Sequence, residues 1–170
     1  MPDWRDQLVE RHPDLFEIVF DGRVHRPGLP AVGDGWRDLV ERAVARIAAA
    51  AGGSASAIKI DQIKEKFGTL RLYWSGEVPD AVRDAIGEAV DLAEARSAVT
   101  CEACGAPGGL WNDDGWYRTA CDRHGKGRKV PIRPGYEGLL QVWRLDGPPR
   151  WVRYDRNTDA FVEVEAPPDR

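Results

Sequence analysis

The chain of 170 residues is poor in cysteine, histidine and methionine, with three, three and one of these residues. A disulfide framework needs an even number of cysteines, so three cysteines do not form one. No apolar run approaches the roughly 20 residues that a membrane-spanning helix needs. The first residues lack the basic, apolar and cleavage regions of a signal peptide. Reduced cysteines fit a reducing compartment, and we therefore expect a cytoplasmic protein.

An excess of positive charge is also missing. The chain carries 24 Lys and Arg against 28 Asp and Glu, which gives a formal net charge of −4. This balance argues against general nucleic-acid affinity of the whole surface. A hydrophobic content of 42% and a charged content of 31% are typical of soluble globular domains. The length fits one domain, or one domain with a small appendage.

Motifs of the common enzyme classes are absent. The sequence contains no Gly-rich phosphate loop, no nucleophile elbow and no paired-carboxylate pattern. His12 precedes Pro13, and His25 has no nucleophile near it in sequence, so both are expected to be surface or capping residues. We therefore predict no catalytic residue and a protein that is not an enzyme.

All three cysteines fall into one pattern, Cys101-Glu102-Ala103-Cys104 and, after sixteen residues, Cys121-Asp122-Arg123-His124. Zn²⁺ favours four tetrahedral sulfur and nitrogen ligands, and two short hooks at this separation supply them. A Cys₃His set fills all four positions, whereas catalytic zinc keeps one position open. We therefore predict a structural zinc site with the ligands Cys101, Cys104, Cys121 and His124.

Other uses of these residues fit less well. A c-type haem site needs histidine directly after the second cysteine, where this chain has Gly105. A redox Cys-x-x-Cys pair leaves Cys121 and His124 unexplained. A zinc deaminase needs a His-x-Glu hook ahead of a Pro-Cys-x-x-Cys hook, and that order is absent. Arg118 and Arg123 lie near the ligands in sequence and are expected to offset the surplus charge of three thiolates.

Helical periodicity predicts two main helices and a short one. Residues 3–12 read as the short helix. Residues 36–47 repeat apolar side chains on one face, with Asp34 as the N-cap and an end at the two glycines that follow Ala51. Residues 80–93 repeat in the same way after Pro79, which fits the first turn of a helix.

Alternating patterns predict antiparallel hairpins, so the expected class is α+β with helices packed on hairpins. Residues 58–75 read as a hairpin that turns at residues 64–68, with Ile60 and Gln62 on the same face. Residues 110–119 read as a hairpin between the metal hooks, because Asp114-Gly115 is a typical two-residue turn.

The last part of the chain reads as a β extension. Residues 123–129 are basic and glycine-rich, which favours a flexible segment. Strands are expected at residues 140–145, 151–154 and 161–164. The predicted organisation is an α+β core (residues 1–99), an embedded zinc-knuckle unit (100–125), and a basic linker with a C-terminal β extension packed on the core (126–170).

Three motifs follow one another: Gly33-Asp34-Gly35-Trp36, then Ile63-Lys64-Glu65-Lys66-Phe67-Gly68-Thr69-Leu70-Arg71, then the two hooks. In this order they resemble a group of short uncharacterised zinc-knuckle proteins of phages, prophages and scattered bacterial genomes. The resemblance spans residues 3–125, with Thr69 where another glycine is usual, and the four hook ligands match that group's ligands. It implies an accessory or mobile-element setting and gives no reaction.

The first functional hypothesis is a non-enzymatic, zinc-stabilised protein-binding protein. It would act as an inhibitor or adaptor, either as a phage accessory factor or as an immunity protein that neutralises a toxin. Acidic residues of the second main helix would steer a basic partner, and a tryptophan beside the second hairpin turn would anchor it. The expected partner surface comprises Lys64, Glu65, Lys66, Asp84, Glu88, Asp91, Trp111 and Trp116.

The alternative hypothesis is a nucleic-acid-binding zinc protein. Residues 123–133 contain no acidic side chain and lie beside the second metal hook, so they are suited to bind phosphates. A solvated loop that partly neutralises the charge of the thiolates is the simpler explanation of the same residues. The expected nucleic-acid contacts are Arg123, Lys126, Arg128, Lys129 and Arg133. A small hydrolase or transferase whose carboxylates converge only in space is the third hypothesis.

Overall fold

A computed structural model describes residues 3–144 and 147–167. It confirms a mixed fold of helices and small antiparallel sheets, the α+β class. No helix in these two ranges is long and apolar enough to cross a membrane. The elements are α1 (Trp4–Arg11), α2 (Pro13–Phe16), β1 (Ile18–Phe20), β2 (Arg23–His25), the 3₁₀ turn η1 (Asp34–Trp36), α3 (Arg37–Ala51), η2 (Gly52–Ala57), β3 (Ile58–Lys66), β4 (Thr69–Gly76), α4 (Asp80–Ser97), β5 (Gly109–Asp113), β6 (Trp116–Ala120), β7 (Arg128–Lys129), β8 (Leu139–Val142), β9 (Arg150–Asp155) and β10 (Ala160–Glu163).

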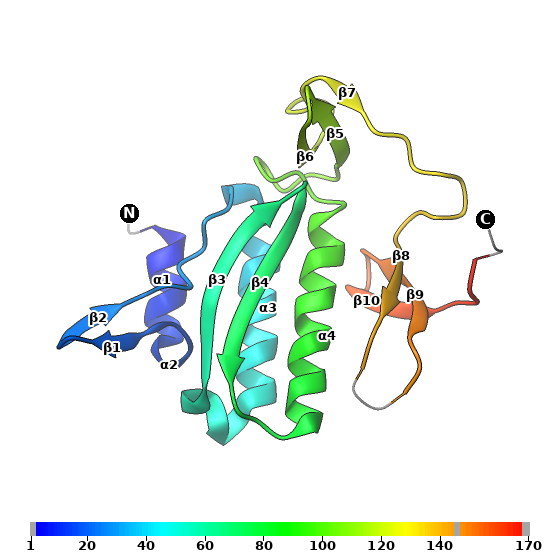
Figure 1. Cartoon of the computed structure of the whole chain (residues 1–170). Coiled ribbons are helices and arrows are strands. Elements are labelled where there is room, and N and C mark those ends of the chain that lie inside the picture. The colour runs from blue at the N-terminus through cyan, green and yellow to red at the C-terminus, as the bar shows by residue number, and fades with distance from the viewer. Residues whose placement is uncertain (1–2, 145–146, 168–170) are drawn as a thin grey trace.

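The main core lies between the long β3–β4 hairpin and the helices α3 and α4, which run side by side along it (Figure 1). The apolar face predicted for α3 is buried, including Leu39 and Ile47, and so are Ile86 and Ala93 of α4. Gly52 is the C-cap of α3, as the sequence predicts. Both main helices are therefore confirmed, and their burial of apolar surface is the principal source of stability in this part.

The imperfect alternation of β3 has a structural cause. Its register against β4 shifts between Ile60, which pairs with Trp74, and Gln62, which pairs with Tyr73. This β-bulge turns Ile63 into the core and leaves Gln62 exposed. The prediction that Gln62 shares a face with Ile60 was therefore wrong.

The β3–β4 turn is tighter than predicted. Lys66 pairs with Thr69, so only Phe67 and Gly68 form the turn, with φ of 52° and 86°. Two consecutive positive φ angles are typical of the type I′ turn, whose twist matches that of the two strands. The residues before Phe67 in the motif are strand residues and not turn residues.

Two predicted helix starts were wrong. The N-cap of α3 is Trp36, without a side-chain capping bond, and not Asp34. The Asp34 carboxylate instead accepts a 2.9 Å hydrogen bond from Trp4 Nε1 and pairs with Arg5 at 3.0 Å. It therefore ties α1 to η1. Helix α4 begins at Asp80, so Pro79 is its N-cap and lies outside the first turn.

The β1–β2 hairpin pairs with no other strand in the described ranges and projects beside α1 (Figure 1). Its turn is Asp21-Gly22, where both residues have a positive φ angle. Most of its apolar side chains do not reach the core: Val19 is 75%, Phe20 72% and Val24 58% exposed.

The C-terminal strands form a three-stranded antiparallel sheet in the order β10-β9-β8, which confirms the predicted β extension. It packs on α4, where Tyr154 meets Leu92 and Ala95. Strand β8 ends at Val142, so Trp143 lies beyond it and is 66% exposed. Residue 145, also predicted in this strand, lies outside the described residues.

Asp159, in the β9–β10 turn, holds this sheet to both main helices. Its buried carboxylate accepts hydrogen bonds from Arg46 of α3 at 2.8 Å, Arg96 of α4 at 3.3 Å and the Tyr154 hydroxyl at 2.6 Å. Burial alone would raise the pKa of Asp159, but the Tyr154 hydrogen bond and the two arginines bring it below its usual value. Burial and the bond to Asp159 together raise the pKa of Tyr154 to about 12.

Part of the acidic face of α4 is paired with cations of neighbouring elements. Glu94 pairs with Arg71 of β4 at 2.6 Å, and Asp91 pairs with Arg144 at 2.9 Å. Arg83, a basic residue of the same helix, lies over the ring of Trp74. Two of the acidic side chains therefore serve to attach neighbouring elements.

Candidate metal centre and the surface around it

Cys101, Cys104, Cys121 and His124 converge, with one ligand atom of each within 4.8 Å of all the others. Cys104 Sγ lies 3.8 Å from Cys121 Sγ, and His124 Nδ1 lies 3.5 Å from Cys101 Sγ and 3.4 Å from Cys121 Sγ. A tetrahedron with Zn–S bonds of about 2.3 Å and Zn–N bonds of about 2.0 Å has S···S and S···N edges of about 3.8 and 3.5 Å. The four residues therefore lie close enough to hold a metal ion, and the three distances are compatible with zinc.

Backbone N–H groups point at the sulfur atoms. Burial raises the pKa of the Cys101 thiol, but the amides of Cys121, Cys104 and Ala103 outweigh it and bring that pKa below the usual value. For Cys104 the amide of Ala106 lowers the pKa, while desolvation and the neighbouring thiols raise it above the usual value. Three adjacent thiols oppose one another's ionisation, and a cation among them removes that opposition.

The first hook is docked on the motif around η1. Gly35 N–H donates to Glu102 O at 2.8 Å, and Trp36 Nε1 donates to Thr100 O at 2.7 Å. A β-carbon at Gly35 would lie 2.3 Å from Cys101 O and 2.5 Å from Cys104 N. Only glycine permits this approach, which explains why the Gly33–Trp36 motif accompanies the metal hooks.

The tip of the β3–β4 hairpin is docked on the other side of the same unit. Thr119 of β6 donates a hydrogen bond from Oγ1 to Gly68 O at 2.6 Å. A β-carbon at Gly68 would lie 2.5 Å from Leu110 Cδ1, and Glu65 accepts a hydrogen bond from Gly68 N–H. All three motifs of the sequence therefore meet at one end of the molecule. We call this part, residues 100–130 with the β3–β4 tip (residues 64–69), the Cys₃His end.

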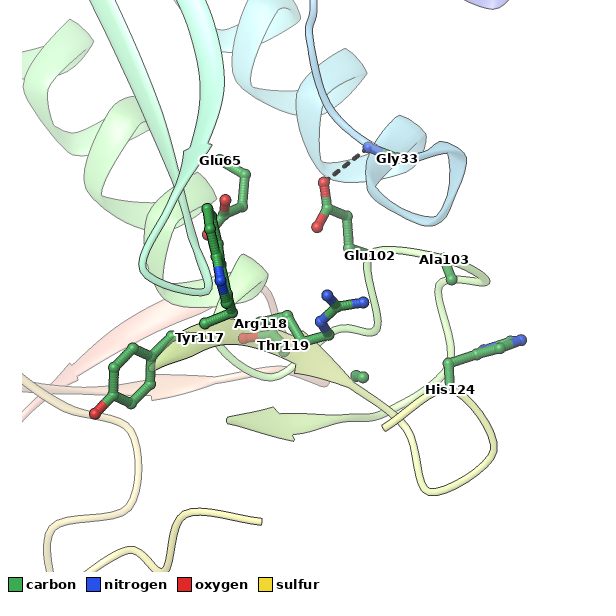
Figure 2. A pocket seen from close by; sticks show the side chains of 10 residues that line it. Gly33, Glu65, Glu102, Ala103, Tyr117, Arg118, Thr119 and His124 are labelled. Carbon is green, nitrogen blue, oxygen red and sulfur yellow. Dashed lines mark hydrogen bonds between the residues drawn. The ribbon is translucent and has the colours of Figure 1, made fainter. Parts of the chain in front are cut away.

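A cavity of about 350 Å³ lies where these segments meet. Glu65 and Glu102 reach it from different segments, and Arg118 and His124 also line it (Figure 2). Glu102 is held by Gly33 N–H at 2.9 Å. The lining residues include no serine, cysteine or lysine.

Two large aromatic side chains stand exposed at adjoining hairpin tips. Phe67 of the β3–β4 turn is 74% exposed and Trp116 at the start of β6 is 76% exposed. Both line one surface pocket together with Lys66 and Tyr117. The sequence predicts exposure of one tryptophan beside the second turn, and Trp116 confirms it. Phe67 was missed because a turn residue gives no periodic signal. We call Phe67, Trp116 and Tyr117 the aromatic surface.

Basic side chains without a partner gather at this end. In the described part of the chain, seven basic side chains have no hydrogen-bonding, ionic or ring partner. They are Arg23, Lys66, Arg118, Arg123, Lys126, Arg128 and Arg150. Five of the seven belong to the Cys₃His end, and the two that do not are Arg23 and Arg150. By contrast, three acidic side chains there are engaged, Glu65 and Glu102 by backbone N–H groups and Asp122 by Lys129 at 3.0 Å.

The predicted basic segment is partly ordered by pairing. Arg128 and Lys129 form β7 and pair with Asn112 and Trp111 of β5, so this stretch is an edge strand and not the free linker expected. Arg118, Trp111 and Lys129 stand opposite one another across β6, β5 and β7, which puts their side chains on one face. Of the other predicted contacts, Arg133 lies over the ring of Tyr136.

The residues predicted to contact a protein partner do not form one surface. Glu65 and Lys66 lie beside Trp116, whereas the first turns of α4 lie at the end of the molecule opposite the Cys₃His end (Figure 1). Of the other predicted residues, Asp84 and Glu88 lie on α4, and Asp91 pairs with Arg144. Lys64 lies over the ring of Tyr73, and the half-buried Trp111 lies under Lys129.

Comparisons with known proteins give no further identification. No protein-family model, no curated protein and no solved structure matches this chain. Function is therefore argued from the geometry of the Cys₃His end.

Proposed function

We propose that this chain is a non-enzymatic, zinc-stabilised binding protein of the accessory type, and that its Cys₃His end binds nucleic acid. The metal in this proposal is structural Zn²⁺, held in a reducing, cytoplasmic setting. The observation that carries the proposal is the gathering of unpartnered cations at the Cys₃His end. Elsewhere most basic side chains are engaged, as Arg46 and Arg96 are with Asp159.

Unpartnered cations supply the sequence-independent part of nucleic-acid affinity, because each phosphate contact releases condensed counterions. The Cys₃His end carries seven basic and five acidic side chains, so its formal net charge is positive, whereas the formal net charge of the whole chain is −4. A zinc ion with three thiolates would add −1 to this end, which leaves it positive. Charges farther away than the Debye length of about 8 Å are largely screened at physiological salt. The acidic body therefore does not cancel the local attraction.

The test is binding of labelled oligonucleotides at two salt concentrations, with a charge-matched control. Lys126→Gln/Arg128→Gln removes two unpartnered cations of the Cys₃His end. Arg23→Gln/Arg150→Gln removes two unpartnered cations elsewhere and gives the same net charge. We expect the first pair to weaken binding at least tenfold and to reduce the salt slope by about two, one for each lost phosphate contact. The second pair should bind like the wild type.

Equal losses in both variants would show that net charge matters and the Cys₃His end does not. Absence of binding by the wild type at about 50 mM salt, where electrostatic contacts are strongest, would end the nucleic-acid proposal.

A protein partner is the second candidate function, in the inhibitor or adaptor role of a phage accessory factor or immunity protein. The observation that favours it is the β1–β2 hairpin, which exposes the cross-strand pair Val19 and Val24 on one face and Phe20 on the other. Soluble proteins seldom expose contiguous apolar surface without a binding role. Pull-downs from nuclease-treated and untreated host lysates test it with Phe20→Ser and, as control, Trp143→Ala. A protein that both treatments recover, and that only Phe20→Ser loses, would support this candidate.

A further inference from the structure

The aromatic surface has features that phosphate binding alone does not require. Phe67 and Trp116 are each about three-quarters exposed, at 74% and 76%. In the described part of the chain the aromatic ring pairs are Phe20 with His25 and Tyr154 with Phe161, so neither ring is stacked on another. Exposing two large rings side by side carries a hydration cost that a ligand with flat apolar faces removes.

The two rings are held in place by their turns. Phe67 and Gly68 form a type I′ turn, and Asp114 and Gly115, with φ of 48° and 89°, form another directly before Trp116. The hydrogen bond from Thr119 Oγ1 to Gly68 O joins the β3–β4 hairpin to β6. The aromatic side chains therefore meet a ligand with little loss of backbone freedom.

Cations flank both rings along the chain. Lys66 directly precedes Phe67, and Arg118 lies two residues after Trp116 on the same face of β6. Neither cation has an ionic partner in the described part of the chain. Exposed rings next to free cations are the two elements of single-strand binding, in which bases stack on aromatic side chains and phosphates contact basic ones.

We propose that the aromatic surface binds single-stranded nucleic acid, with bases stacked on Phe67 and Trp116 and phosphates at Lys66 and Arg118. A duplex keeps its base faces covered by neighbouring base pairs, so it offers these rings no stacking partner. The inference rests on the proposed nucleic-acid function and specifies the class of ligand. A protein partner at the same surface is an outcome that the test distinguishes.

The experiment measures fluorescence anisotropy of a labelled oligothymidylate of about 12 nucleotides, a length within the usual single-strand site size, and of a duplex of equal length. Wild type, Phe67→Ala, Trp116→Ala and Trp143→Ala are compared. Trp143 is the matched control because it is also exposed, at 66%, and lies in the C-terminal region. Metal content and the far-UV circular dichroism spectrum establish that each variant is folded.

We expect the wild type to bind the single strand at least tenfold more tightly than the duplex. Phe67→Ala and Trp116→Ala should each lose roughly tenfold on the single strand and little on the duplex, and Trp143→Ala should lose neither. Equal affinity for both ligands, or unchanged single-strand affinity in both ring variants, would overturn this inference and leave the proposed function standing. Failure to bind either ligand would overturn both. Loss of a captured protein in Trp116→Ala, without any effect on oligonucleotides, would assign the surface to a protein partner instead.

Discussion

The helical body and the Cys₃His end are stabilised in different ways. In the body, Trp36, Ile47 and Ile58 are fully buried and charged side chains meet in pairs such as Arg71 with Glu94. At the Cys₃His end, every residue of β5 is only half-buried and the first three residues of β6 are exposed. Because this end buries so little apolar surface, we expect its fold to depend on a bound metal ion and on docking to the body. The same lack of internal pairing leaves its cations and rings available to a ligand.

Loss of a metal ligand tests this comparison with the largest expected effect. A structural zinc site contributes on the order of 10 kcal/mol to the folding of a small unit. Cys104→Ser and His124→Ala should release the metal and unfold residues 100–125. The amides of α3, α4 and the part of the β3–β4 hairpin away from its tip should stay protected from hydrogen exchange. Metal analysis and hydrogen exchange measure both effects. His25→Ala, an exposed histidine away from the site, is the control and should keep its metal. Full metal content with an unchanged circular dichroism spectrum in His124→Ala would refute the assignment.

The junction between the two regions is tested by adding one methyl group. Gly35→Ala places a β-carbon against Cys101 O and Cys104 N, so η1 and the first hook must separate. We expect a loss of about 3 kcal/mol in unfolding free energy and weaker metal binding. Gly53→Ala is the matched control, because a β-carbon there meets no atom within 4 Å. If both variants melted alike in thermal denaturation, the close approach at Gly35 would have no energetic role.

The charge network of the body has a smaller and pH-dependent effect. The folded-state pKa of Asp159 lies below its unfolded value, so its contribution is present above about pH 4 and is lost as the pH falls through the folded pKa. Asp159→Asn should cost about 2 kcal/mol near pH 7 and flatten the acid limb of the stability curve. Asparagine tolerates the φ of 52° at this position.

Asp21→Asn is the control for that substitution. Asp21 also has a positive φ, of 50°, in a hairpin turn, but it is exposed and has no ionic partner in the described part of the chain. Urea unfolding between acid and neutral pH should separate the two variants. An equal pH dependence of Asp159→Asn and wild type would assign the acid sensitivity to other carboxylates.

Sequence patterns predicted the elements whose causes are local. The apolar repeat of α3, the Asp114-Gly115 turn and the ligand spacing each depend on residues close in the chain. The face of Gln62 and the capping role of Asp34 were predicted wrongly. The strand register that places Gln62 and the hydrogen bond from Trp4 to Asp34 both depend on partners that are distant in the sequence. Asp159 gave no signal at all, since its partner Arg46 lies 113 residues away.

The sequence by itself determined the candidate metal ligands, the two main helices and the hairpins, because ligand chemistry and hydrophobic periodicity act over short separations. The tertiary structure alone decided that Gly35, Gly68 and the metal hooks meet at one end. It also decided that Phe67 and Trp116 stand exposed together there, and that the unpartnered cations gather around them. Whether a side chain is exposed, and whether a charge finds a partner, depends on residues that are distant in the sequence. The close backbone approaches at Gly35 and Gly68 fix which segments meet, and so decide which side chains stay accessible to solvent.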